Sequence, residues 1–273
     1  PLGELSYLLR GEGRKAVVTY HSDIVRQRVL LKLYRPLLWR FLEKARCIIA
    51  SSPPYIQSSP YLKSLAHKCT VIPYGIDLTL FRSLDDEGTE AIKRRYGGPL
   101  ILFVGKLRYY KGLSYLIQAM QGVEATLLVI GQGPMEREWH TLAGRLGVTH
   151  KVLFLGQVND EELVRYYNAS EFLVLPSCQR SEAFGIVLLE AMACGKPVIS
   201  TELGTGTSYA NLDGQTGLVV PPGEPVALRE AINKLLWDEA LRRQLGERAK
   251  ERVRREFSAQ MMVDRMIALY QAL

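Results

Sequence analysis

The stretch "SEAFGIVLLEAMACGKPVIS", residues 181–200, predicts a loop, a buried helix and a buried strand in close succession. Gly185 stands where the helix should begin, and Glu182 and Glu190 lie on either side of an apolar run. A buried carboxylate is costly unless it is paired or hydrogen-bonded. Two acids in a segment that otherwise belongs to a hydrophobic core therefore indicate a binding function as well as a structural one.

Similar apolar runs on both sides of this stretch define the fold class. Each is short, nearly continuous and ends in Gly, Pro or Ser, and helix-like segments separate them. The predicted strands cover residues 99–107, 125–133, 151–158, 171–177, 196–201 and 216–223. Strands that are apolar on both faces and alternate with helices are typical of a parallel sheet covered on both sides. The second half of the chain is thus predicted to form a parallel α/β domain.

The first part of the chain has fewer such runs. Its predicted strands cover residues 14–23, 47–55 and 69–77, and a basic, aromatic helix covers residues 24–46. This is too little for a doubly wound domain, so we expect the chain to begin in the middle of one. The predicted domains are a partial N-terminal domain over 1–82, a linker over 83–98, a C-terminal domain over 99–255 and a final helix over 256–273 that packs back toward the N-terminal part.

The composition is that of an ordinary globular protein, with 47% hydrophobic and 23% charged residues in 273. No apolar run approaches the roughly 20 residues that a membrane span needs, which favours a cytoplasmic location.

The four cysteines are widely spread, without the spacing of a metal site or a disulfide framework. The net charge of +7 favours an anionic partner: a membrane surface, a phosphorylated substrate or a nucleic acid.

The segment "FVGKLRYYKG", residues 103–112, predicts an anion site. A buried strand ends at Gly105, and Lys106, Arg108 and Lys111 follow before the next helix opens. Backbone amides and the dipole of a helix N-terminus add to the ammonium charges. The carboxyl ends of strands are also where open α/β sheets bind ligands. The alternative is an ordinary basic surface loop.

The segment "VIGQGPMERE", residues 129–138, repeats this pattern more weakly. Gly131 and Gly133 stand at a strand end, but Glu136 occupies the place of the third glycine of a dinucleotide-binding fingerprint. A tight turn is the better interpretation, and it argues against an NAD-dependent enzyme.

The opening stretch has the features of a site for a polyol with an attached phosphate. If the helix begins near residues 184–186, the amides of Phe184, Gly185 and Ile186 point outward and can bond an oxygen-rich ligand. Glu182 lies in the loop beside them, and Glu190 lies about one turn into an apolar helix. The alternative for either acid alone is a structural role at the helix N-terminus or on an exposed face.

Three motifs together resemble a known family. Glu182 and Glu190 form E-x7-E with Phe-Gly inside it, residues 105–112 form G-K-L-x-x-x-K-G, and "VIPYGID" covers 71–77. In this order and spacing they are similar to family 4 of the retaining, nucleotide-sugar-dependent GT-B glycosyltransferases. The resemblance covers nearly the whole chain. It implies an α/β fold of GT-B type, with a complete Rossmann-like C-terminal domain and a partial N-terminal α/β domain.

The resemblance also implies a role for each motif residue. Glu182 would bind hydroxyls of the donor sugar, Glu190 would bind the ribose, and Lys106 and Lys111 would neutralise the departing diphosphate. His21 in "VVTYHSD" would face the donor from the first domain, with Asp23 as a weaker neighbouring candidate, although a lone histidine after a strand is more often structural. The remaining donor-binding candidates share positions at strand ends or at the helix N-terminus: Gly105, Arg108, Gly131, Val158, Phe184, Gly185 and Ile186.

The chemistry expected from the resemblance needs neither metal nor cofactor. A departing nucleoside diphosphate develops negative charge that something positive must stabilise, and lysines with a helix N-terminus are available. The D-x-D pair usual in metal-dependent transferases is absent. The family's retention implies front-face attack, with the leaving phosphate helping to deprotonate the acceptor. One departure is that Lys106 stands where many relatives have arginine. Another is that the family's Gly-Gly-x-x-Glu run after "STELG" is replaced by other residues, so that no carboxylate can be assigned in the loop of Gly204, Thr205 and Gly206.

The resemblance is greatest to bacterial mannosyl- and rhamnosyltransferases of polysaccharide and lipopolysaccharide assembly. It implies GDP-mannose as first donor and UDP-glucose as second, and a saccharide or lipid-linked acceptor. The basic amphipathic helix 24–46 predicts peripheral binding to an anionic membrane, with a core helix as the alternative. The rival functions are a truncated, non-catalytic nucleotide-sugar binder, a nucleotide-sugar epimerase, and a nucleic-acid binder, which no motif supports.

Overall fold

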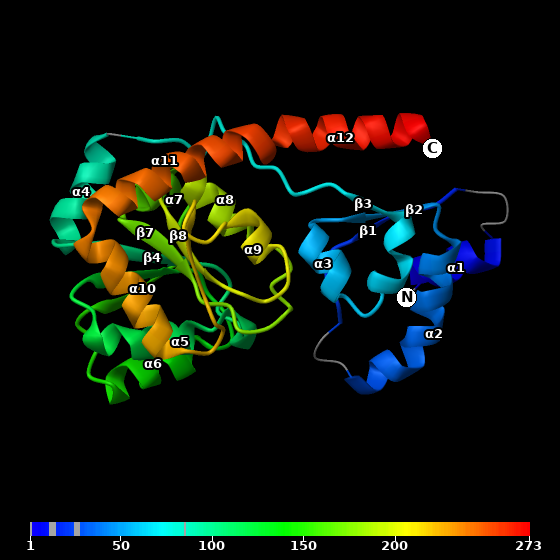
Figure 1. Ribbon diagram of the computed structural model, residues 1–273. Coiled ribbons are helices and arrows are strands. Elements are labelled where there is room, and N and C mark those ends of the chain that lie inside the picture. The colour runs from blue at the N-terminus through cyan, green and yellow to red at the C-terminus, as the bar shows by residue number, and fades with distance from the viewer. Residues whose placement is uncertain (1, 11–14, 25–27, 85) are drawn as a thin grey trace.

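The computed structural model describes residues 2–10, 15–24, 28–84 and 86–273. Figure 1 shows two α/β units side by side, a smaller one from the start of the chain and a larger one from most of the rest. Each unit has its own parallel sheet and its own hydrophobic core. The α/β fold class predicted from the sequence is confirmed.

The larger unit is built on six parallel strands, one for each strand predicted between residues 99 and 223. Apolar residues occupy nearly every strand position, and all five residues of the central strand β4 are buried. In chain order the strands are β4 (Leu100–Val104), β5 (Thr126–Ile130), β6 (Val152–Gly156), β7 (Phe172–Leu175), β8 (Val198–Thr201) and β9 (Gly217–Val220). Their order across the sheet is β6-β5-β4-β7-β8-β9.

Helices cover both faces of this sheet. The first face packs on α5 (Leu113–Ala119), α6 (Glu136–Arg145) and α10 (Pro225–Trp237). The second face packs on α7 (Asp160–Ala169), α8 (Ile186–Ala193) and α11 (Glu239–Glu256). Short segments η2 (Tyr109–Lys111), η3 (Met120–Gly122) and α9 (Thr207–Ala210) complete the unit. Among the described residues, no helix is long and apolar enough to cross a membrane.

The strand order identifies one edge of the sheet as the expected place for a ligand. From β4 the chain adds β5 and β6 on one side of the sheet, then returns to add β7, β8 and β9 on the other side. Open parallel sheets bind ligands outside the carboxyl ends of the strands where this reversal occurs. The segments that follow β4 and β7 therefore lie at the reversal point.

The smaller unit has three parallel strands in the order β1-β2-β3, namely β1 (Val17–Tyr20), β2 (Cys47–Ala50) and β3 (Cys69–Val71). Its helices are α1 (Leu2–Arg10), α2 (Arg28–Lys44), α3 (Pro53–Ser58) and the 3-10 segment η1 (Lys63–Lys68). The helix predicted over residues 24–46 corresponds to α2, which contains Pro36. Residues 25–27 of that prediction lie outside the described residues.

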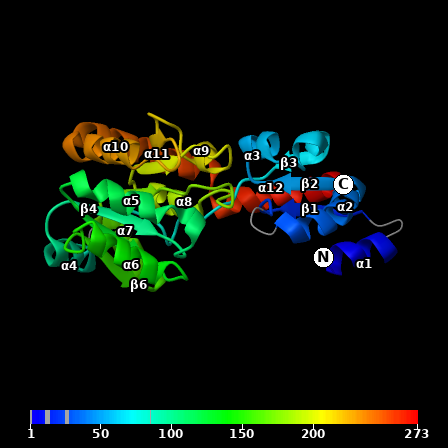
Figure 2. The same cartoon turned by 90° about the horizontal axis from the view of Figure 1, so that it is seen from below.

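Two stretches of chain join the units. The first leads from β3 to α4 (Glu87–Tyr96), a helix within the predicted linker that packs against α7. The second follows α11, after which α12 (Ala259–Ala272) runs beside the smaller unit in both views (Figures 1 and 2). The two stretches are hydrogen-bonded where they cross, because the amides of Ile76 and Ala259 donate to the carbonyls of Phe257 and Ile76, each at 2.9 Å.

Candidate functional site

The loop after β4 brings a lysine into the sheet's reversal point. Gly105 ends the strand with a φ of 151°, and a Cβ there would lie 3.3 Å from both Cε and Nζ of Lys111. Lys111 lies in η2, and only 8% of its surface is exposed. The glycine therefore leaves the space in which this ammonium group is held.

A buried ion pair joins this loop to the loop after β7. Lys111 Nζ lies 2.7 Å from Glu182 Oε2, and each side chain is 10% exposed. The Ser177 hydroxyl donates to the same oxygen at 2.8 Å. Glu182 Oε1 has no hydrogen-bond or ion-pair partner among the described residues. One carboxylate oxygen is thus held and the other is left available.

The backbones of the two loops also touch. The amide of Cys178 donates to the carbonyl of Tyr110 at 2.8 Å. A Cβ at Gly112 would overlap the carbonyl oxygen of Pro176, so only glycine allows this approach. The distance between Lys111 and Glu182 is therefore set by main-chain contacts as well as by their charges.

The N-terminus of α8 opens beside this pair. Gly185 is its N-cap, with a φ of 81° and no side-chain cap, and a Cβ there would lie 2.7 Å from Leu175 Cδ2. The amides of Phe184, Gly185 and Ile186 have no acceptor among the described residues. Free amides at a helix N-terminus attract anions.

Glu190 lies near the middle of α8, and its carboxylate has a buried partner. The Tyr167 hydroxyl donates to Glu190 Oε2 at 2.7 Å. Burial raises the pKa of Glu190, while the Tyr167 hydrogen bond and the charge of Lys111 oppose this and the charge of Asp160 adds to it. Burial followed by the Glu190 charge raises the pKa of Tyr167, so its hydroxyl remains a donor.

The glycine turn after β5 packs on the loop after β4. Gly131 has a φ of 130°, its amide donates to the carbonyl of Gly156 at 2.7 Å, and a Cβ there would overlap Gly105 O. Val158 is half-buried against the core beneath α7 and α8. The structure thus brings Gly131 next to Gly105.

Lys106 and Arg108 differ from Lys111. Both are exposed, and neither side chain makes a hydrogen bond or ion pair with a described residue. They are therefore free surface cations beside the buried pair, and the structure does not join them to Glu182.

His21 reaches the larger unit through a tyrosine that the sequence did not single out. It follows β1 and is exposed; its Nδ1 lies 2.6 Å from the Tyr74 hydroxyl, and the two rings stack at 6.0 Å. Tyr74 also contacts the buried ring of Phe184 edge-on at 5.3 Å. Tyr74 lies within "VIPYGID", so this motif was the available signal for it.

A model of one protein family matches most of the larger unit. Residues 86–252 match the family described as "Glycosyl transferases group 1". The chain is also 45% identical over 260 residues to the D-rhamnosyltransferase WbpZ of Pseudomonas aeruginosa, covering 95% of this chain and 68% of that protein. The chain belongs to the group 1 glycosyltransferases. Its resemblance to this family, predicted from the three motifs, is confirmed.

A second relative and two solved structures agree with this. The O-antigen chain mannosyltransferase C of Escherichia coli is 40% identical over 273 residues, covering 100% of this chain and 73% of that protein. The sucrose-phosphate synthase of Thermosynechococcus elongatus superposes with a TM-score of 0.87 at 30% identity, covering 99% of this chain and 71% of that one. Anabaena Alr3699/HepE, solved in complex with UDP-glucose, superposes with a TM-score of 0.87 at 21% identity, covering 100% and 76%. These neighbours confirm the GT-B fold.

Proposed function

We propose that this chain is a retaining, metal-independent hexosyltransferase that moves mannose from GDP-mannose to a saccharide or lipid-linked acceptor in polysaccharide assembly. The observation that carries the proposal is the buried pair of Lys111 and Glu182, 2.7 Å apart, beside the free amides that precede α8. Both lie at the reversal point of a Rossmann-type sheet. This is an arrangement suited to a diphosphate joined to a sugar.

The diphosphate end is assigned to Lys111 and the helix N-terminus. The bond between the sugar and the phosphate breaks with charge developing on the nucleoside diphosphate, and donors fixed in a buried site stabilise such charge far more than water does. Lys111 and the amides of Gly185 and Ile186 supply these donors. Lys106 and Arg108, exposed beside them, add positive charge at the entrance.

The sugar end is assigned to the two acids. Glu182 Oε1 would accept hydrogen bonds from donor-sugar hydroxyls, because Oε2 is already held by Lys111 and Ser177. Glu190, kept in place by Tyr167, would accept from the ribose. His21 would face the donor from the smaller unit. For retention, the acceptor hydroxyl attacks from the side of the leaving group and loses its proton to the departing phosphate.

Two relatives favour a manno-configured sugar. One relative is named a mannosyltransferase and the other a D-rhamnosyltransferase, and D-rhamnose is 6-deoxy-mannose. The two sugars share the configuration of their ring hydroxyls and differ only at C6. We therefore place GDP-mannose first and UDP-glucose second, and we place the enzyme at the cytoplasmic face of the membrane.

The test is calorimetry with GDP, UDP, ADP and TDP and their sugars, in EDTA, followed by a transfer assay with the tightest donor. We expect GDP and GDP-mannose to bind best, and Lys111→Ala or Glu190→Ala to weaken binding while Lys234→Ala, on exposed α10 surface, does not. Binding without transfer or donor hydrolysis would support the non-catalytic alternative. Equal binding in both site variants would reject the assigned site.

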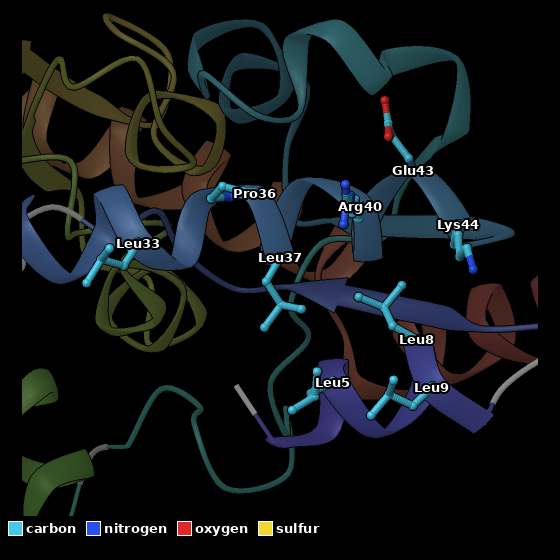
Figure 3. A pocket seen from close by; sticks show the side chains of 9 residues that line it. All are labelled: Leu5, Leu8, Leu9, Leu33, Pro36, Leu37, Arg40, Glu43 and Lys44. Atoms are coloured by element: carbon cyan, nitrogen blue, oxygen red, sulfur yellow. The ribbon is translucent and has the colours of Figure 1, made fainter.

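The acceptor side of the proposal includes an anionic membrane surface. Between α1 and α2 lies a hollow of about 750 Å³ lined mainly by leucines, with two basic residues and one acid, Glu43, also lining it (Figure 3). Leu33 and Leu9 are 84% and 74% exposed, and Arg40 and Lys44 lie beside them. An apolar face flanked by cations is typical of helices that lie in a lipid interface, where lipid-linked acceptors reside.

Vesicle co-sedimentation tests this surface. We expect binding to vesicles with anionic lipid, less binding to neutral ones, and a loss of binding in Arg40→Glu/Lys44→Glu. A paired change on α11, Arg243→Glu/Arg248→Glu, is the control for net charge. Co-sedimentation that is indifferent to lipid charge and to the α2 variant would remove the membrane from the proposal.

A further inference from the structure

Arg180 lies in the tight turn that carries Glu182. The amide of Glu182 donates to the carbonyl of Gln179 at 3.0 Å, which closes the turn over residues 179–182. Arg180 occupies the second position of this turn, two residues before the acid. Whatever fixes the Arg180 side chain therefore also fixes the turn that presents Glu182.

The Arg180 guanidinium joins three segments of the molecule. Its NH2 group lies 3.0 Å from Asp23 Oδ2 in the smaller unit. Its NH1 group donates to the carbonyls of Leu203 and Gly204, each at 3.4 Å, in the loop after β8. It also lies 5.5 Å from the ring centroid of Tyr55, a cation–π distance.

Asp23 is held ready for this cation by its own unit. Its Oδ1 accepts from the hydroxyls of Tyr20 at 3.0 Å and Ser59 at 2.7 Å, and its side chain is only 7% exposed. Burial, followed by the charge of Asp23, raises the pKa of Tyr20, so that hydroxyl stays a donor. Among the described residues, Arg180 is the only cation that pairs with this carboxylate. A buried charge that loses its partner is costly.

A second contact joins the same segments. The Ser58 hydroxyl of α3 donates to the carbonyl of Gly204, the carbonyl that Arg180 also approaches. In the same loop, the amide of Gly206 donates to the carbonyl of Ala183 at 2.7 Å, one residue past Glu182. The docking of the two units is thus continuous with the loop that carries Glu182 and Phe184.

We propose that Arg180 is a positioning residue that docks the smaller unit and orients Glu182 in one step. Through Asp23 it holds the segment that carries His21, and through the turn it holds Glu182, so one guanidinium sets the geometry between the two units. The role in catalysis rests on the proposed transferase function. An exposed surface pair would contribute little, but the near-complete burial of Asp23 makes this pair different.

The experiment compares Arg180→Gln, Arg180→Lys, Asp23→Asn and the double variant Asp23→Asn/Arg180→Gln, with Arg243→Gln on exposed α11 as the matched control. We expect Arg180→Gln to lower kcat about 100-fold, as misplacement of a reacting group does, with the dissociation constant for GDP unchanged. Arg180→Lys should recover part of the rate. The double variant should be no slower than either single variant, because the two residues act as a pair.

Hydrogen exchange of backbone amides, measured without the nucleotide-sugar donor, tests the positioning role of Arg180 independently of the transferase function. We expect the amides of Glu182 and Gly206 to exchange faster in Arg180→Gln and Asp23→Asn, but not in Arg243→Gln. Unchanged exchange at both amides, or additive losses of rate in the double variant, would overturn the positioning role. Faster exchange in a protein that transfers no sugar would support the role of Arg180 in docking and reject the transferase function alone.

Discussion

The two units differ in where the polar groups of the candidate site find partners. In the larger unit, Lys111 pairs with Glu182, and Glu190 pairs with Tyr167, all within the same unit. In the smaller unit, by contrast, the polar residues of the candidate site find partners outside the unit. Among the described residues, Asp23 pairs with Arg180 of the larger unit, and His21 bonds Tyr74 on the connecting stretch. Nucleotide recognition should therefore survive the loss of contacts between the units, whereas sugar transfer should not.

The largest expected effect comes from breaking the ion pair within the larger unit. Lys111→Ala leaves Glu182 buried without its cation and should lower the free energy of unfolding by about 3–5 kcal/mol. It should also weaken GDP binding. Urea denaturation and calorimetry measure the two effects.

Two further variants control this prediction. Lys106→Ala removes an exposed lysine of the same loop and should leave the stability nearly unchanged. Replacing the pair together, as Lys111→Met/Glu182→Leu, should restore much of the lost stability but not GDP binding. A double variant less stable than Lys111→Ala would contradict a charge pair.

The next effect concerns the helix N-terminus. Gly185→Ala forces a side chain into a φ of 81° and places a Cβ 2.7 Å from Leu175 Cδ2, so stability should fall by about 1–3 kcal/mol, and GDP binding should weaken. Gly214→Ala is the matched control, since its φ is 66° but nothing lies within 4 Å of the added atom. Equal losses in thermal unfolding for both variants would mean that the contact with Leu175 plays no part.

A smaller effect is expected for Glu182→Gln, which should strengthen the binding of the product GDP but slow the turnover of the sugar donor. Glu182→Gln removes the anion that neutralises Lys111, so free GDP should bind more tightly, by about 1 kcal/mol, while turnover of the sugar donor falls. Calorimetry and the transfer assay measure the two halves separately. Weaker binding of free GDP would show that Glu182 does not compete with the diphosphate for Lys111.

The smallest effect is a pH dependence. Burial raises the folded-state pKa of Glu190 above its ordinary value of 4.5, so the folded protein binds more protons than the unfolded chain just above that pH. The contribution of Glu190 to stability is therefore present below pH 4.5 and lost as pH rises through the raised pKa. Relative to the wild type, Glu190→Gln should gain stability across this window in urea denaturation. If Glu190→Gln instead lost stability relative to the wild type as the pH rises, the pKa of Glu190 would not be raised in the folded protein.

The sequence predicted the larger sheet well because most of its strands are buried on both faces. Such strands are short apolar runs, which can be recognised in the sequence without knowing which strands lie beside them. Each predicted strand has its counterpart in the structure. Charged residues close to these runs also stood out: Lys111 in the loop after one strand, and Glu182 and Glu190 around the start of an apolar helix. The structure pairs Lys111 with Glu182, and the charge of Lys111 also acts on Glu190.

The partners of those residues could not be predicted in the same way. Ser177 and Tyr167 are ordinary residues for their positions, and only the packing of the loops and of α7 against α8 gives them a carboxylate to bond. Asp23 was noticed beside His21, but its partner Arg180 is 157 residues away in the chain. Contacts of this length depend on how the two units meet, and no spacing in the sequence contains that information.

The backbone crossing between the units constrains how they can move. Ile76 makes hydrogen bonds on both sides, to Phe257 and Ala259, and a Cβ at Gly75 would overlap the backbone of Ser258. Both connecting stretches are therefore tied to each other at one place, and a glycine is needed there for their backbones to meet. A side chain at position 75 would push the two stretches apart, and so would disturb the junction of the units without replacing any residue of the candidate site.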